Sequence, residues 1–263
     1  MDPFQPLLGT SVVLVAHPDD EVIGFGALMQ KMKKAIVVFA TDGAPHDEYF
    51  WGPYGSPERY SQIRQEEACE ALKIVGAEAV FLADLVEGGI ADQELFKRLD
   101  EAVKAFDQVV EQIHPDCLLT LAYEGGHPDH DAACFIASHV GRNRGLPVWE
   151  SPLYHRNADG SGAVQTFPKL TGREIELQVE SEALEKKLKM FHTYKSQKLV
   201  LEQFRPEVEQ FRPVADYDFT QRPLPWKLNY ELWQWKMTGE EVSAAFASYL
   251  RGFAHPERSE GTL

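Results

Sequence analysis

The feature that most constrains the fold is the alternation of short apolar runs with helical patterns through the first half of the chain. Strand-like runs are predicted at residues 12–16, 35–40, 79–82 and 118–122. Helical patterns are predicted at residues 26–33, 61–75, 93–113 and 128–143. Such alternation is typical of βαβ units, whose strands form a parallel sheet. The sequence therefore predicts an α/β fold in which helices cover a mainly parallel sheet.

The second half of the chain has a less regular pattern. We expect an edge strand at 149–154, a hairpin-like pair at 163–170 and 174–179, a helix at 181–196, an extended segment at 217–230, an amphipathic helix at 239–250 and a disordered tail at 255–263. A chain of 263 residues can bury one large core. We predict a single domain over residues 1–263, with its core at about 10–150 and a C-terminal elaboration at about 151–263.

The charge balance limits the classes of partner. Lys and Arg total 26 against 41 Asp and Glu, giving a net charge of -15. That charge would repel a phosphate backbone, so nucleic acid is not an expected partner. The sequence contains no apolar stretch of membrane-spanning length, and Met1 to Thr10 lacks the pattern of a signal peptide. We expect a cytoplasmic protein without a membrane span.

Two polar clusters each follow a predicted buried strand. Residues 16–21 read Ala-His-Pro-Asp-Asp-Glu, and residues 125–130 read Gly-Gly-His-Pro-Asp-His. Because the carboxyl ends of parallel strands meet at one edge of a sheet, the two clusters are expected to meet there. A lone histidine is more often structural, but two His/Asp clusters at strand ends favour a metal site. Catalytic zinc takes three protein ligands, and His17, Asp20 and His130 can supply them.

These motifs resemble the LmbE/PIG-L family of zinc-dependent N-deacetylases. The resemblance extends to the Thr41-Asp42-Gly43 turn, to the Arg64-x-x-Glu67 helix and to the strand that ends at Asp84. It covers roughly residues 10–145. It implies a Rossmann-like three-layer α/β sandwich with one divalent ion, usually zinc. It also implies a small N-acylated substrate, often containing glucosamine.

The resemblance also implies a role for individual residues. His17, Asp20 and His130 would bind the metal, Asp19 would be the general base, and His127, if cationic, would stabilise an oxyanion. Arg64 would either contact the sugar or pair with Glu67 on a solvated face. Three other side chains, those of Tyr123, Glu124 and Asp42, could line the pocket or turn away from it, and we predict that Tyr123 and Asp42 contact the substrate. Asp129 would orient His127 or face solvent, and Glu21 would open a helix.

Other functions remain open at this stage. Similar His/Asp clusters build two-metal phosphoesterases, although the obvious ligands suffice for one ion. A non-catalytic binding module is the other alternative, but the first strand is not followed by the Gly-x-Gly-x-x-Gly turn of dinucleotide-binding folds. The aromatic stretches at residues 49–54 and 226–235 could stack on a sugar or bury an interface of a homo-oligomer.

Overall fold

The structure, a computed structural model, describes residues 2–254. Its strands are β1 Thr10–Val15, β2 Lys34–Phe39, β3 Glu78–Phe81, β4 Cys117–Leu121, β5 Val148–Ser151, β6 Tyr154–Arg156, β7 Gly162–Val164, β8 Ile175–Gln178 and β9 Val208–Pro213. Its α-helices are α1 Asp20–Gly24, α2 Glu48–Trp51, α3 Pro57–Val75, α4 Leu99–Ile113, α5 Pro128–Arg144, α6 Ser181–Thr193, α7 Lys198–Leu201, α8 Asn229–Leu232 and α9 Gly239–Ala254. The tail expected at residues 255–263 lies outside the described residues.

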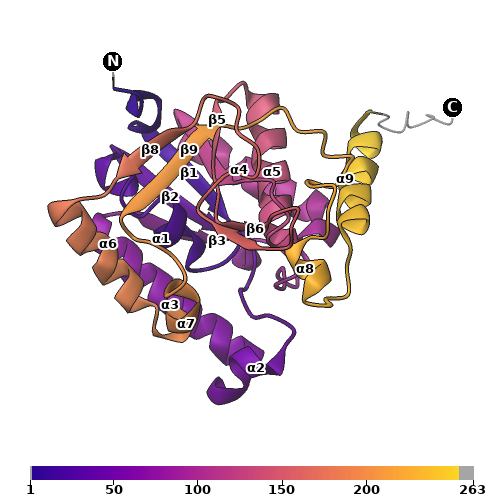
Figure 1. The fold of residues 1–263 in the computed structure, drawn as a ribbon, viewed down its shortest axis with the longest axis horizontal. Helices are drawn as coiled ribbons and strands as arrows, with labels where there is room; N and C mark the ends of the chain where they lie inside the picture. Colours follow the sequence, from indigo (N-terminus) through magenta and orange to yellow (C-terminus); the bar gives the residue numbers. More distant parts are fainter. Residues whose placement is uncertain (1, 255–263) are drawn as a thin grey trace, which may run out of the picture.

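A seven-stranded sheet runs through the middle of the molecule in the order β3-β2-β1-β4-β5-β9-β8 (Figure 1). Strands β1 to β5 are parallel, and β9 and β8 continue the sheet in antiparallel fashion. The four strands predicted in the first half are confirmed to within two residues at each end. The mainly parallel α/β sandwich predicted from the sequence is therefore present.

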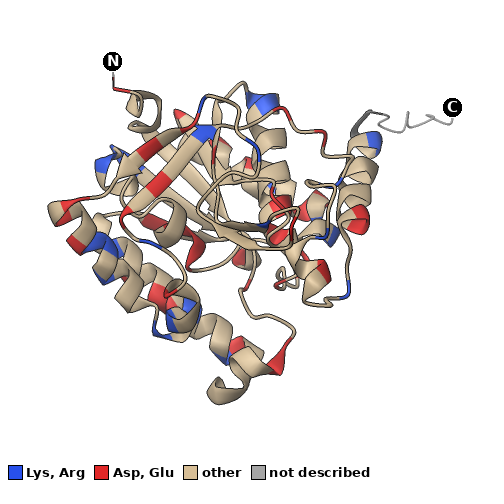
Figure 2. Cartoon of the chain, in the orientation of Figure 1, with Lys and Arg blue, Asp and Glu red and all other residues tan. Residues whose placement is uncertain are grey.

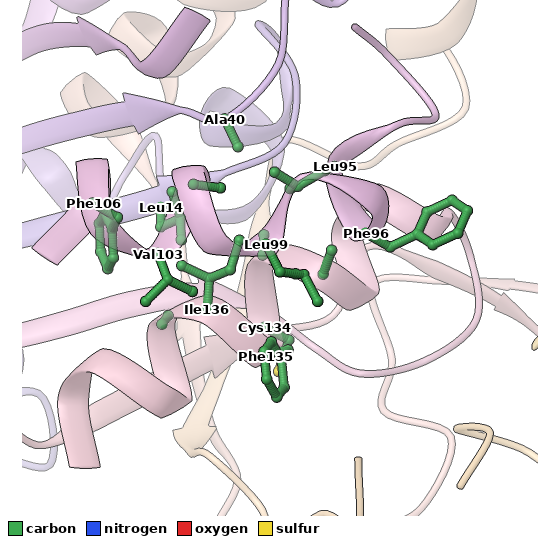
Figure 3. Packing of buried hydrophobic residues seen from close by; sticks show 14 of the residues in the cluster. Leu14, Ala40, Leu95, Phe96, Leu99, Val103, Phe106, Cys134, Phe135 and Ile136 are labelled. Carbon is green, nitrogen blue, oxygen red and sulfur yellow. The ribbon is translucent and has the colours of Figure 1, made fainter. Parts of the chain in front are cut away.

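Strand β1 shows why the sheet must be covered on both faces. Val12 and Leu14 pack into one hydrophobic cluster, and Val13 and Val15 pack into the other. Successive side chains of a strand point to opposite faces, so an unbroken apolar run needs helices on both sides. Helices α4, α5 and α9 cover one face, where α4 lies over Leu14 (Figure 3), and α1, α3 and α6 cover the other.

The strand pairings of the second half differ from expectation. The predicted edge strand is β5, which lies inside the sheet between β4 and β9. The two segments predicted to pair with each other instead pair elsewhere, because β7 joins β6 and β8 joins β9. Strand β9 was not expected from the sequence. Strand β9 pairs with β5 in the sheet, and it is longer than β7, so it offers β8 a longer partner than β7 could.

The first predicted helix is also misplaced. The pattern predicted a helix at 26–33, whereas α1 occupies residues 20–24 and is followed by turns. Side chains from the second half of the chain bind the backbone here. Glu209 accepts the N–H groups of Ala27 and Leu28, and Lys187 donates to the carbonyl of Ile23. These bonds replace the hydrogen bonds that a continuing helix would have made.

Charged side chains are spread over the helices and loops, with Lys and Arg interspersed among the more numerous acidic residues (Figure 2). Within residues 2–254, none of the helices combines the length and hydropathy needed to cross a bilayer.

Candidate metal centre

Loops at the carboxyl edge of the sheet bring the two sequence clusters together. His17 follows β1, and His127 and His130 lie at the start of α5, which follows the neighbouring strand β4. The ring centroids of His17 lie 4.4 Å from His127 and 5.3 Å from His130. Residues separated by more than a hundred positions therefore share one site, as the parallel sheet predicts.

His17 lies among three carboxylates. Its Nδ1 is 3.5 Å from Asp20 Oδ2, and its Nε2 is 3.3 Å from Asp129 Oδ2 and 3.5 Å from Asp92 Oδ1. Burial lowers the pKa of His17, but the carboxylates, led by Asp92, raise that pKa overall to well above its ordinary value. So much negative charge in a buried site favours a cation.

The donor set fits a metal ion. Both ring nitrogens of His130 and Oδ1 of Asp92 are buried and have no hydrogen-bond partner within residues 2–254. His130 Nε2 lies 3.3 Å from Asp20 Oδ1. Two ligands that each lie about 2.0–2.1 Å from one tetrahedral zinc are about 3.3 Å apart. The spacing between His130 Nε2 and Asp20 Oδ1 is therefore that of two ligands of a common ion, whereas His17 Nδ1 lies 3.5 Å from the other oxygen of Asp20.

A second group of possible ligands shares His17. Ligand atoms of His17, Asp92, His127 and Asp129 lie within 4.8 Å of one another, as do those of His17, His127 and His130. The expected set of His17, Asp20 and His130 therefore stays a prediction, and the variants described below distinguish it from this second group.

Asp19 has an unusual backbone conformation, with φ at +133°. Side chains with a Cβ atom rarely occupy this region, so the residue must be held there. Its N–H donates to Glu21 Oε2 at 3.0 Å, and its Oδ1 accepts from Arg64 Nη2 at 3.0 Å. Burial raises the pKa of Asp19 to about 6, while the Arg64 charge opposes that rise.

The support for Asp19 continues into the second half of the chain. The Tyr194 hydroxyl, at the end of α6, donates to Glu21 Oε1 at 2.5 Å. Burial raises the pKa of Tyr194 well above its ordinary value, so the phenol keeps the proton that it donates. Glu21 was expected only to open a helix. It also links Tyr194 to the strained backbone of Asp19.

Arg64 lines the pocket, and protein groups accept hydrogen bonds from its Nη1 and Nη2, whereas its Nε is buried without a hydrogen-bond partner within residues 2–254. Besides Asp19, Nη1 binds the carbonyl of Gly43 at 2.5 Å and Nη2 binds that of Pro18 at 2.6 Å. The alternative in which Arg64 pairs with Glu67 on a solvated face is wrong, because both side chains are buried and Glu67 binds Ser196. A contact between Arg64 and substrate stays a prediction.

His127 caps helix α5. Its Nδ1 accepts the N–H of Asp129 at 3.1 Å, so the proton of the neutral ring lies on Nε2, which is 3.3 Å from Asp92 Oδ1. Burial and the neighbouring His17 lower the pKa of His127. The cationic form considered at first is thus disfavoured, but the neutral ring can still donate from Nε2.

Asp129 and Asp42 hold the loop that carries Asp92. Asp129 is fully buried and accepts the N–H groups of Gln93 and Leu95, so its expected alternative of facing solvent is wrong. Asp42 accepts the N–H groups of Ala44 and Asp92 at 3.0 and 2.9 Å. It does not line the pocket that contains His17. The expectation that Asp42 contacts substrate is therefore corrected. Its carboxylate instead anchors the backbone of the loop that carries Asp92.

Asp92 is the site residue that sequence reasoning missed. The helix expected to start at residue 93 starts instead at Leu99, and the freed segment turns toward His17. The segment follows β3, whose carboxyl end lies at the same edge of the sheet as the two clusters. That position was a usable signal. It could not single out Asp92, because Asp84, Glu87 and Glu94 lie in the same connection.

Tyr123 and Glu124 turn away from the site. Tyr123 packs against Tyr217 and Phe219 and donates its hydroxyl proton to the carbonyl of Gln221. Successive side chains of a strand and of the residues that extend it point to opposite faces of the sheet. The side chain of Tyr123 points to the face covered by α4, α5 and α9, away from the pocket. The expectation that Tyr123 lines the pocket is therefore corrected. Glu124 accepts the N–H groups of Leu153 and Tyr154.

The site forms the floor of a pocket of about 380 Å³, a volume typical of small-molecule sites. His17, Asp19, Asp20, Asp92 and His127 line its floor, and residues from α2 and from the second half of the chain line its walls.

Comparison with known protein families gives one match. The family described as PIG-L, GlcNAc-PI de-N-acetylase, matches residues 12–140. The matched segment contains both His/Asp clusters and ends within α5. The chain carries a PIG-L family domain. The residues after position 140 that line the walls of the pocket lie outside the segment matched by the family.

One curated relative of this protein is the 1D-myo-inositol 2-acetamido-2-deoxy-alpha-D-glucopyranoside deacetylase of Corynebacterium diphtheriae. The two are 27% identical over 189 residues, which span 63% of this chain and 64% of the relative. The chain thus matches slightly less than two thirds of that relative's length.

Solved structures share the fold. A deacetylase of teicoplanin biosynthesis superimposes with a TM-score of 0.61 at 19% identity, covering 80% of this chain and 99% of the other. The 4-carboxy-2-hydroxymuconate hydratase of Pseudomonas putida KT2440 superimposes with a TM-score of 0.52 at 16% identity, covering 79% and 96%. At these identities the likeness extends to the fold alone, and a shared fold does not define the reaction of this protein.

Proposed function

We propose that the protein is a metal-dependent hydrolase that removes an N-acyl group, most simply N-acetyl, from a small amino-sugar-like substrate. The observation that carries this proposal is a buried group of histidines and aspartates at one end of a pocket. His17, Asp20 and Asp19 line that pocket, and His130 Nε2 lies 3.3 Å from Asp20 Oδ1 behind it. The PIG-L family match and the deacetylase names of the relatives agree with this proposal.

His17, Asp20 and His130 would hold one zinc ion. When bound, such an ion polarises a carbonyl and makes water more acidic. An amide carbonyl is a weak electrophile, so both effects are needed near neutral pH. The buried carboxylates and unpartnered histidine nitrogens described above suit this ion.

Asp19 would act as the general base. Its Oδ1 is bound to Arg64, whereas its Oδ2 has no hydrogen-bond partner within residues 2–254 and is available to an attacking water. Asp19 would accept the proton of that water and deliver it to the nitrogen of the leaving amine as the C–N bond breaks. The products are the free amine and the carboxylate, acetate for an acetyl group.

His127 would stabilise the negative charge that develops on the carbonyl oxygen. His127 lines the pocket, its Nε2 lies 3.3 Å from Asp92 Oδ1, and its Nδ1 is fixed by the N–H of Asp129. A fixed donor costs little reorganisation when the charge appears, and removing one typically lowers turnover by about 10²–10³.

The first test is to measure metal content per chain together with acetate release from a panel of N-acetylated amino sugars, before and after chelation. One zinc per chain and chelator-sensitive acetate release are expected. Two metals per chain would favour a phosphoesterase that uses the second ligand group around Asp92. Acetate release that survives complete removal of metal would overturn the proposal.

A further inference from the structure

The pocket has two chemically different ends. The floor carries the histidines and aspartates described above, whereas the outer part is walled by aromatic rings from separate segments. Phe50 comes from α2, Phe204 follows α7, and Trp233 and Trp235 follow α8. We call these four residues the aromatic wall. Phe50 is 37% exposed and Trp233 is 44% exposed, although large apolar side chains are usually more deeply buried.

The aromatic wall begins directly beside the reacting groups. The Trp235 ring lies 4.9 Å from that of His127, and Trp233 continues the wall 5.0 Å from Trp235, both measured between ring centroids. A substrate whose amide reaches His127 would therefore have these indoles beside the reacting group.

Two polar side chains near the wall already have hydrogen-bond partners within the protein. Asn229 Oδ1 accepts from Arg156 Nε at 2.7 Å, and Gln197 Nε2 donates to the Tyr60 hydroxyl at 2.6 Å. A sugar ring bound flat against the wall would need partners for several hydroxyl groups. Because these two side chains are paired within the protein and the rings of Phe50 and Trp233 are exposed, the outer part of the pocket suits an apolar group better than a sugar ring.

We propose that the substrate carries an apolar alkyl or aryl group next to the scissile amide, and that the aromatic wall binds this group. The identity of the amide rests on the proposed function, whereas binding of the apolar group does not. The group has two sources in an N-acylated amino sugar. It is either the aglycone attached to the sugar or a longer chain on the acyl side, and the experiment distinguishes them.

The experiment measures binding to chelator-treated full-length protein by calorimetry, so that turnover does not interfere. The aglycone arm compares the hexyl and methyl glycosides of N-acetylglucosamine. The acyl arm compares N-hexanoylglucosamine with N-acetylglucosamine. Burying the added methylenes should tighten binding about tenfold or more in one of these arms. Acetate and hexanoate release are measured separately with the metal-loaded protein.

Adjacent residues of α2 provide a matched pair of variants. Phe50→Ala removes a ring from the aromatic wall, whereas Tyr49→Ala removes its neighbour, which is 75% exposed and does not line the pocket. Phe50→Ala and Trp233→Ala should each reduce the preference for the hexyl compound severalfold. Tyr49→Ala should leave the preference unchanged. Circular dichroism and the mass in solution check that each variant folds and keeps its assembly state.

Each outcome bears on one proposal. A preference for the hexyl glycoside assigns the apolar group to the aglycone, and a preference for N-hexanoylglucosamine assigns it to the acyl side. Equal affinities in both arms, or a preference that survives both Phe50→Ala and Trp233→Ala, would overturn the inference. A wall-dependent preference without release of either acid would overturn the proposed function and leave the inference standing.

Discussion

The region matched by the family, residues 12–140, and the region after it contribute to the pocket in different ways. The first supplies His17, Asp19, Asp20, Asp92 and His127 at the floor. The second supplies Tyr194 behind Asp19 and three of the four rings of the aromatic wall. The groups proposed to contact a reacting amide thus lie in short motifs, whereas the groups proposed to support the base or to select the substrate come from separate segments of the second half. Substitutions in the first region should therefore change metal binding and turnover strongly, whereas substitutions in the second region should have smaller effects on kcat or on substrate preference.

The largest effect is expected for a metal ligand of the first region. His130→Ala should abolish metal binding and, with it, measurable turnover, because it removes one of the three predicted ligands. His127→Ala should keep the metal and lower turnover by about 10²–10³. Elemental analysis of both purified variants checks the assignment. Metal loss in His127→Ala with retention in His130→Ala would move the ion to the ligand group around Asp92.

A slightly smaller effect is expected for the predicted base. Asp19→Ala should retain one metal per chain while turnover falls by about 10²–10⁴, the usual contribution of a general acid–base group. The measurement pairs metal content with steady-state acetate release. If the variant loses its metal, the roles of Asp19 and Asp20 have been exchanged.

An intermediate effect is expected for Asp92, which lies in the first region but outside the motifs. Its carboxylate lies 3.5 Å from His17 Nε2 and 3.3 Å from His127 Nε2, so it orients both rings. Asp92→Asn should weaken metal affinity by about 10–100-fold, as is typical of groups that orient ligands. Competition with a chelating dye measures the change. An unaltered affinity would limit Asp92 to a role in the loop.

The smallest effect is expected for the second region. Tyr194→Phe removes the hydroxyl that holds Glu21 and should lower kcat about tenfold, with KM and metal content unchanged, because Asp19 loses part of its support. Tyr217→Phe is the matched control. It removes a phenol bound to the buried carboxylate of Glu150, away from the pocket. Equal losses of kcat in the two variants would show that Tyr194 acts through stability alone.

The sequence predicted the parts that depend on local pattern. The β1 and β4 runs and the clusters after them lie where expected, because a buried parallel strand is apolar throughout and its carboxyl end faces the site. Asp92 could not be predicted, because its position depends on hydrogen bonds that Asp129 accepts from the N–H groups of Gln93 and Leu95, in the segment before α4 begins at Leu99. Tyr194 could not be predicted either, since nothing near it in sequence marks its contact with Glu21 across 173 positions.

Gly126 joins the two regions at one point. A Cβ atom built there would lie 2.1 Å from the carbonyl oxygen of Tyr154, so the backbone of β6 rests directly on the loop that leads to His127. This contact has a practical consequence for protein engineering. We therefore expect that the chain up to the end of β5 would not keep this site on its own. Cutting the chain there would remove β6, against which the loop that leads to His127 packs. Exchanging second halves between relatives to alter selectivity would require the graft to reproduce this backbone approach within a few tenths of an ångström.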